Sequence, residues 1–200
     1  MESITGVLTA FGVSAVSPLN VYLSLLIVAL LARFTSLVNL NPSFEAMTSI
    51  WVIILLAALF VWELVADKVP VLDNINDIAG TFIRPAAGGI IWLANNNVIT
   101  DYNPILAFIL GVFIAGGVHV AKATGRGISS ATTGGSANPV ISSIEDIVAG
   151  VGTILSIVLP FAVPLVLAIV AFFAIRWWRR RQRGKKGVLG VQQTNENQTG

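Results

Sequence analysis

The sequence has 200 residues, of which 55% are hydrophobic and 11% are charged. Soluble domains carry about 25% charged residues, so this chain has too few to cover a globular surface with solvated groups. With no cysteine as well, the composition excludes a soluble enzyme, a disordered chain and a disulfide scaffold. We therefore expect an all-α protein, a polytopic bundle of transmembrane helices.

Four charge-free apolar runs predict four membrane spans, with one or two short or broken helices beside them. The runs cover residues 4–32, 46–62, 102–118 and 147–175. A helix needs about 20 residues to cross a hydrocarbon core about 30 Å thick, so the first and last runs are too long for one straight span. Both of these runs contain proline.

The first run is interrupted by Ser17 and Pro18. Serine is a favoured N-cap and proline suits the first turn of a helix, so this pair can end one helix and begin another. The pattern predicts a short segment to about Val16 and a span from Pro18 to about Phe34. A single kinked helix is the alternative.

Three Asn-Pro pairs predict further helix starts, at Asn41, Asn103 and Asn138. Ser142 and Glu145 have the Ser-x-x-Glu spacing of a capping box, which would open the final helix. Residues 67–97 form a mixed segment in which Pro85 precedes a short apolar piece, either a half-span or an interfacial helix. Residues 124–139 are rich in Gly, Ser and Thr, typical of a connecting loop or of a backbone-amide cradle for an anion.

Seven of the twelve bases lie in one short run after the last apolar segment, beside Trp177 and Trp178, residues that favour the membrane–water interface. We expect a membrane domain over residues 1–178 and a basic, then polar, disordered tail over 179–200. A basic tail favours a cytoplasmic C-terminus and contact with anionic lipid headgroups. The start Met-Glu-Ser is unlike a cleaved signal. The bases of the run are Arg176, Arg179, Arg180, Arg181, Arg183, Lys185 and Lys186.

Ionisable residues gather where the second and third runs end. Helical spacing places Glu63 and Asp67 on one face, and places His119, Lys122 and Arg126 on one face of another helix. Charges near lipid are costly and usually turn inward to pair. The alternative is that they are headgroup-level charges with no function, and that His119 is a structural hydrogen-bonded residue.

This reasoning predicts two sets of site residues. A substrate-binding set that would attract an anion comprises Ser17, Asn20, Lys68, Arg84, His119, Lys122 and Arg126. A charge network that would balance these bases comprises Glu63, Asp67, Asp73, Asp77, Glu145 and Asp146.

Small residues recur every four positions in two of the apolar runs, a pattern that allows helices to approach closely. One stripe, Ala107, Gly111 and Ala115, leads to His119. The other stripe consists of Gly6, Ala10 and Ser14.

Signatures of catalysis are absent from the sequence. With no cysteine and one histidine, the usual zinc sites cannot form. The Gly-rich segment lacks the spacing of a nucleotide-binding loop and of a nucleophile elbow. We expect no cofactor, no metal and no nucleic-acid partner. We also expect no enzyme activity, and an intramembrane hydrolase based on carboxylates is the third hypothesis, after the two given below.

Several motifs in a fixed order resemble a family of small bacterial membrane proteins with plastid relatives, known only as a domain of unknown function. The resemblance covers the chain up to about Ile175. It implies a polytopic inner-membrane protein and no particular substrate. The matching motifs are Ser17-Pro18-Leu19-Asn20 with Tyr22, Asp67-Lys68-Val69-Pro70 with Asp73, Ile83-Arg84-Pro85, His119-x-x-Lys122-Ala123 with Arg126, and Asn138-Pro139 with Ser142 and Glu145-Asp146.

Two functional hypotheses follow for a multi-pass protein of the inner membrane. The first is a small transporter, channel or lipid-translocating module with an anion-attracting polar site, because broken helices and charges at membrane depth mark substrate paths. The second is a scaffold or assembly factor that packs its small-residue stripes on partner helices and holds anionic lipid with its tail. Both hypotheses allow a homo-oligomer.

Overall fold

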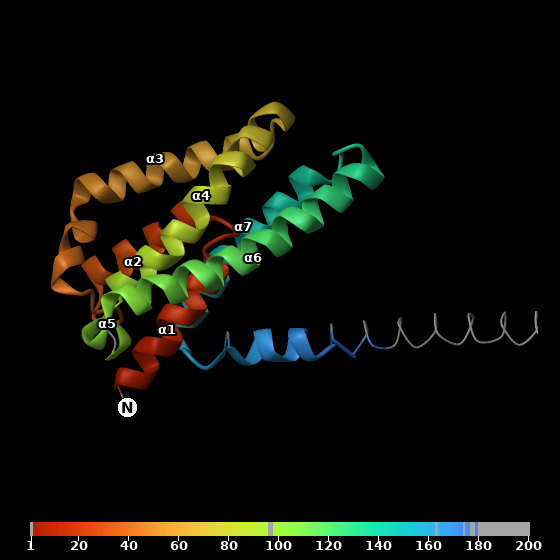
Figure 1. Ribbon diagram of the computed structural model, residues 1–200. Coiled ribbons are helices and arrows are strands. Elements are labelled where there is room, and N and C mark those ends of the chain that lie inside the picture. Colours follow the sequence, from red (N-terminus) through yellow and green to blue (C-terminus); the bar gives the residue numbers. More distant parts are fainter. Residues whose placement is uncertain (1, 96–97, 163, 174, 177–178, 180–200) are drawn as a thin grey trace, which may run out of the picture. The chain divides into compact units, whose positions relative to one another are not determined.

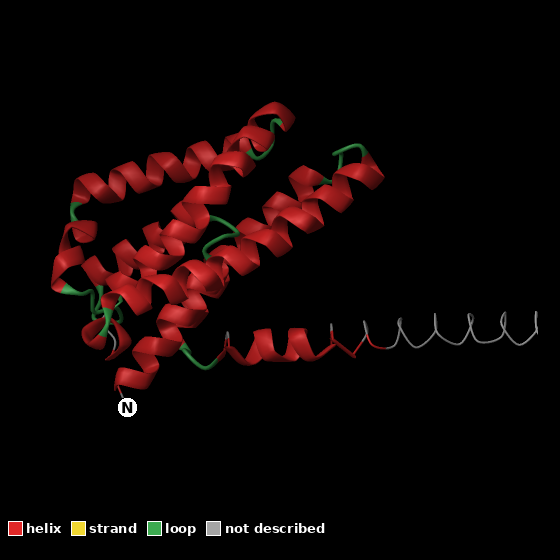
Figure 2. Ribbon diagram, in the orientation of Figure 1, coloured by secondary structure: helices red, strands yellow, loops and turns green. Residues whose placement is uncertain are grey.

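The computed structural model describes residues 2–95, 98–162, 164–173, 175, 176 and 179. These residues form helices joined by turns and loops, with no strand among them (Figures 1 and 2). Their sole sheet-like contact is an isolated bridge between Leu40 and Asn95. The expected all-α class is therefore confirmed.

The chain divides into two units, Met1–Val163 and Pro164–Gly200. Within the described part of the second unit lies a short apolar helix, Pro164–Phe173. The predicted disordered tail lies outside the described residues, apart from Arg179. The first unit contains α1 (Glu2–Val16), α2 (Val21–Phe34), the 3-10 helix η1 (Pro42–Thr48), α3 (Ile50–Ala66), α4 (Pro70–Ala94), α5 (Val98–Tyr102), α6 (Pro104–Thr133) and α7 (Asn138–Val158).

The prediction of four long spans was wrong. Among the described residues, two helices are long and apolar enough to cross a membrane, α6 with 30 residues and α7 with 21. A third span arises if η1 and α3, which meet at a bend of 65°, count as one. The first apolar run yields two shorter helices, α1 and α2, and α7 ends at Val158, before the prolines of the last run.

The break between α1 and α2 is confirmed, but the residue that caps α2 is Asn20 rather than Ser17. The Asn20 side chain accepts a hydrogen bond from the backbone N–H of Leu23, at the first turn of α2. Ser17 instead donates its hydroxyl to the carbonyl of Ser14 at the end of α1. Asparagine caps helices as well as serine does, because its side-chain oxygen reaches the free N–H groups of the first turn.

The other predicted helix starts occur at the expected places. Asn41 and Asn103 cap η1 and α6 through their side-chain oxygens. Asn138 is the first residue of α7, and its amide donates to Ser130 rather than capping the helix. Because α7 begins at Asn138, the capping box predicted at Ser142 was wrong, and Ser142 lies one turn inside the helix.

The segment expected to hold a half-span or an interfacial piece is helical, and so is most of the segment expected to be a loop or an anion cradle. Residues 70–94 form one helix, α4, with Pro85 inside it. The Gly/Ser/Thr-rich segment extends α6 to Thr133, where Gly134 and Gly135 take positive φ angles of 62° and 83° and turn the chain. Several of its hydroxyls bond carbonyls of the same helix; Thr124, for example, donates to the carbonyl of Val120. The backbone amides are thus committed to the helix, and no anion cradle forms there.

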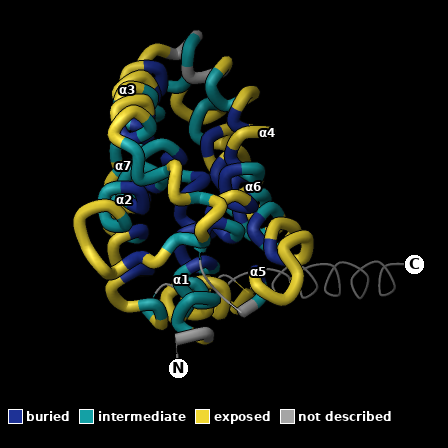
Figure 3. Tube along the Cα trace, turned by 90° about the vertical axis from the view of Figure 1, so that its left-hand side faces the viewer, coloured by how far each residue is buried: buried dark blue, intermediate teal, exposed yellow. Residues whose placement is uncertain are grey.

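The most extensive helix contact in the first unit joins α4 to α6, which lie side by side (Figure 1). A methyl group added to Gly111 would overlap the carbonyl oxygen of Gly88, so the backbones touch directly. Ser14 of α1 donates to that same carbonyl at 3.0 Å, which ties α1 to this contact. Buried positions line the faces on which these helices meet (Figure 3).

We expect Gly111→Ala to destabilise the protein by about 1–3 kcal/mol, because the added methyl has to push two backbones apart. The measurement is the thermal unfolding midpoint of the detergent-solubilised protein. The matched control is Gly117→Ala on the same helix, where an added methyl meets nothing within 4 Å. An equal effect of both substitutions would contradict the close contact.

Candidate functional site

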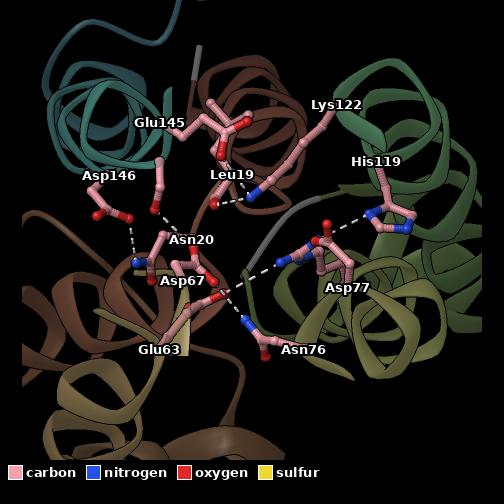
Figure 4. A network of polar contacts seen from close by, with 12 residues as sticks. Leu19, Asn20, Glu63, Asp67, Asn76, Asp77, His119, Lys122, Glu145 and Asp146 are labelled. Atoms are coloured by element: carbon pink, nitrogen blue, oxygen red, sulfur yellow. Dashed lines mark hydrogen bonds and ion pairs between the residues drawn. The ribbon is translucent and has the colours of Figure 1, made fainter. Parts of the chain in front are cut away.

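A cluster of charged side chains is buried where α3, α4, α6 and α7 approach one another (Figure 4). Its bases come from α4 and α6, and its carboxylates come mainly from α3, α4 and α7. We call it the buried charge cluster. Its members, linked by ion pairs, are Glu63, Asp67, Asp77, Arg84, Lys122, Arg126 and Glu145.

Arg126 joins carboxylates from three helices. Its Nη2 lies 2.7 Å from Glu145 Oε2 and 3.4 Å from Asp67 Oδ2, and its Nη1 lies 3.5 Å from Asp77 Oδ2. The Arg126 side chain is 4% exposed, so the charge depends on these partners rather than on solvent. Arg126 thereby links α6 to α3, α4 and α7.

Lys122 lies one turn earlier on α6 and reaches the break between α1 and α2. Its Nζ donates to the backbone carbonyl of Leu19 at 2.7 Å and lies 3.2 Å from Glu145 Oε2. Leu19 belongs to the break, where the chain leaves α1 before Asn20 caps α2. The broken backbone and the cluster therefore form one polar site.

Arg84 pairs with carboxylates on both sides of its guanidinium. Its Nη1 donates to Asp77 Oδ1 at 2.9 Å, and its Nη2 lies 3.7 Å from Glu63 Oε1. Asp77 lies on α4, outside the candidate spans. Burial alone would raise the pKa of Asp77, but the hydrogen bond from Arg84 and the charge of Arg126 outweigh burial and lower it.

The contacts of His119 indicate which of its ring nitrogens carries the proton. Arg84 Nη1 lies 3.4 Å from His119 Nδ1, and an arginine can only donate, so Nδ1 has to accept. The proton of a neutral imidazole then lies on Nε2, which is 3.4 Å from the hydroxyl of Thr81. In this arrangement His119 is a neutral acceptor for a buried arginine.

Asp67 is held by neutral donors as well as by Arg126. Asn76 Nδ2 donates to Asp67 Oδ1 at 2.8 Å, and the hydroxyl of Ser142 donates to Oδ2 at 3.0 Å. A second contact lies beside the cluster, where Asn20 Nδ2 donates to Asp146 Oδ1 at 2.8 Å. Asn20 thus caps α2 with its oxygen and binds α7 with its nitrogen.

Most of the predicted site residues come together, but two of the described ones do not. Lys68 is exposed. Ser17 is buried, with its hydroxyl bonded to a carbonyl of α1 rather than directed to the charged groups. The side chain of Asp73 lies outside the described part of the structure.

Three contributors to the cluster are not predicted from the sequence. Asn76 precedes Asp77 within a polar stretch of α4, which is a weak signal. The spacing of Ser142 and Glu145 predicts a helix cap instead of a bond to Asp67. The carbonyl of Leu19 could have been inferred, because the break predicted at Pro18 frees backbone acceptors.

The cluster contains more carboxylates than bases. Its ion pairs join Glu63, Asp67, Asp77 and Glu145 to Arg84, Lys122 and Arg126, and Asp146 adds a further acid nearby. Across the described residues, no group of three or more His, Asp or Glu side chains is arranged to hold a metal ion. The cluster is therefore an ion-pair network with a surplus of negative charge.

Residues 7–180 match the family model described as a domain of unknown function (DUF4126). The chain belongs to this family. The match confirms the resemblance drawn from the motifs, and it covers every helix that contributes to the cluster. No curated protein and no solved structure matches the chain. The apolar helices indicate a membrane protein.

We expect Asp67→Asn to lower the free energy of unfolding by about 1–3 kcal/mol, because the new amide nitrogen has to face a donor, either Asn76 or Ser142 and Arg126. The matched control is Asp101→Asn, an exposed position on α5, which should change stability little. The measurement is the thermal midpoint of both variants in the same detergent. A fully stable Asp67→Asn protein would show that the ion pairs are not what holds these helices together.

Proposed function

We propose that this protein is a small membrane transport module, a transporter, channel or lipid translocator, whose polar site is the buried charge cluster. The observation that carries the proposal is the hydrogen bond from Lys122 to the carbonyl of Leu19 at the helix break. Transporters commonly bind their ions where discontinuous helices expose backbone groups to charged side chains. Here the break and the charges meet at one place.

The degree of burial favours a functional role over headgroup-level charges. The side chains of Arg84, Lys122 and Arg126 are 2%, 1% and 4% exposed. Charges that only anchor helix ends remain at the interface, where hydration is inexpensive. Three buried bases require a full set of partners. Since apolar residues of similar size would often give an equally stable protein, stability alone does not explain why these charges are present.

The charge balance bears on what the site would accept. An anion was expected because of the bases, but each base is already paired with a carboxylate. The surplus of carboxylates favours a cation over an anion at this site. An anionic solute or headgroup would have to displace existing ion pairs to bind.

The packing favours transport over the scaffold hypothesis. That hypothesis needs the small-residue stripes to be free for partner helices. Ala107, Gly111 and Ala115 are instead buried within the chain, as are Ala10 and Ser14 of the other stripe. The stripes therefore serve contacts inside this protein.

We further propose that the protein resides in the inner membrane with its C-terminus in the cytoplasm. The basic run after the last apolar segment supports this orientation through the positive-inside rule. Anionic lipids are the partners that such a run would bind.

Reconstitution into vesicles tests the transport proposal. We expect wild-type protein to move a monovalent cation, a proton, an anion or a fluorescent lipid across the bilayer, each followed with its own dye or quencher. Lys122→Gln should reduce that movement to the level of empty vesicles, because it removes the charge that binds Leu19 and Glu145.

Arg33→Gln is the control, since Arg33 is an exposed base that donates to the carbonyl of Thr48, at the end of η1, and takes no part in the cluster. It should retain the wild-type rate. If no probe moves with wild-type protein, and a stoichiometric partner co-purifies in mild detergent, the scaffold hypothesis replaces this proposal.

A further inference from the structure

Glu63 is the least satisfied carboxylate of the buried charge cluster. It is 2% exposed, and its Oε2 has no hydrogen-bond partner in the described structure. Asp67, Asp77 and Glu145 accept hydrogen bonds of 2.7–2.9 Å. Glu63 instead has an ion pair with Arg84 in which the nearest atoms are 3.7 Å apart.

The base opposite Glu63 is also incompletely bonded. Arg84 Nη2, the nitrogen that faces Glu63, has no hydrogen-bond partner, whereas Nη1 is used by Asp77 and approaches His119. At 3.7 Å the two groups attract each other without forming a hydrogen bond. An acceptor buried without a bond costs free energy, and an ionised one costs more.

The charges around Glu63 come from each neighbouring helix. Asp67 caps α3, the helix that carries Glu63, while Arg84 lies on α4, Lys122 on α6 and Asp146 on α7. From α2, Tyr22 is near enough to interact with it electrostatically. The bases in this set pair with other carboxylates at shorter distances than Arg84 keeps from Glu63, so Glu63 is the carboxylate whose charge is least compensated.

We propose that Glu63 is a proton-binding site, and that this proton is the coupling ion of the transport module; the coupling role rests on the function proposed above. The step is a simple protonation. A proton from water forms an O–H bond on Oε2, the carboxylate becomes a neutral acid, and no other bond changes. The acid surplus of the cluster falls by one charge.

A proton fits this site better than a metal cation does. Metal ions such as Na⁺ or Ca²⁺ require several oxygen ligands, and the described residues contain no grouping of three or more acidic or histidine side chains for one. A proton requires one free lone pair, which Glu63 Oε2 provides. Asp77, which shares Arg84 with Glu63, is the most exposed member of the cluster, with 27% of its side chain exposed. It marks the side from which a proton would reach Glu63.

Infrared difference spectroscopy of the reconstituted full-length protein tests the site directly. On acidification, wild-type protein should gain the carbonyl band of a buried carboxylic acid. Glu63→Gln should lose that band, while Glu45→Gln, which removes an exposed glutamate, should retain it. Glu63→Asp keeps a carboxyl group and should shift the band rather than abolish it, which provides a second readout if Glu63→Gln folds poorly.

Flux measurements on the same vesicles separate the two proposals. Wild-type flux should depend on an imposed pH gradient, and Glu63→Gln should lose that dependence. If wild-type protein shows no buried-acid band, or if the band persists in Glu63→Gln, the proton site is wrong whatever the flux. If the band behaves as expected and no probe moves, Glu63 binds a proton but the transport function fails.

Discussion

The structure depends on the need to pair three buried bases. Arg84, Lys122 and Arg126 lie on two helices, and their carboxylate partners come from α3, α4 and α7. Removing a charge from water costs several kcal/mol even after relaxation, about what a whole domain has in spare stability. The arrangement of these helices is therefore fixed by where the charges have to meet, as much as by apolar packing.

The sequence allowed the faces of individual helices to be predicted. The spacing of His119, Lys122 and Arg126 places them on one side of α6, and all three are buried there. Glu63 and Asp67 likewise share the buried face of α3 and its cap. Such predictions succeed because a helical period is a local property that tertiary contacts seldom override.

What the sequence could not supply was the pairing between helices and the length of each one. Hydropathy gave four apolar runs but not the length of each helix: the first run forms two short helices, α1 and α2, and α7 already ends at Val158. The bond from Ser142 to Asp67 joins residues 75 positions apart, and a local motif explained Ser142 as a cap instead. The composition of the Gly/Ser/Thr-rich end of α6 favoured a loop, but its threonine hydroxyls bond carbonyls of the same helix, which composition does not reveal.

The close contact of α4 with α6 and the charge cluster are parts of one construction. Gly88 lies one turn from Arg84 on α4, and Gly111 lies two turns from His119 on α6. Because the glycines let the two backbones touch, Arg84 can reach His119 across the interface at 3.4 Å. A larger residue at either glycine would push the two helices apart and lengthen the distance between Arg84 and His119. The small-residue stripe thus does more than pack helices, since it sets the spacing that the buried charges require.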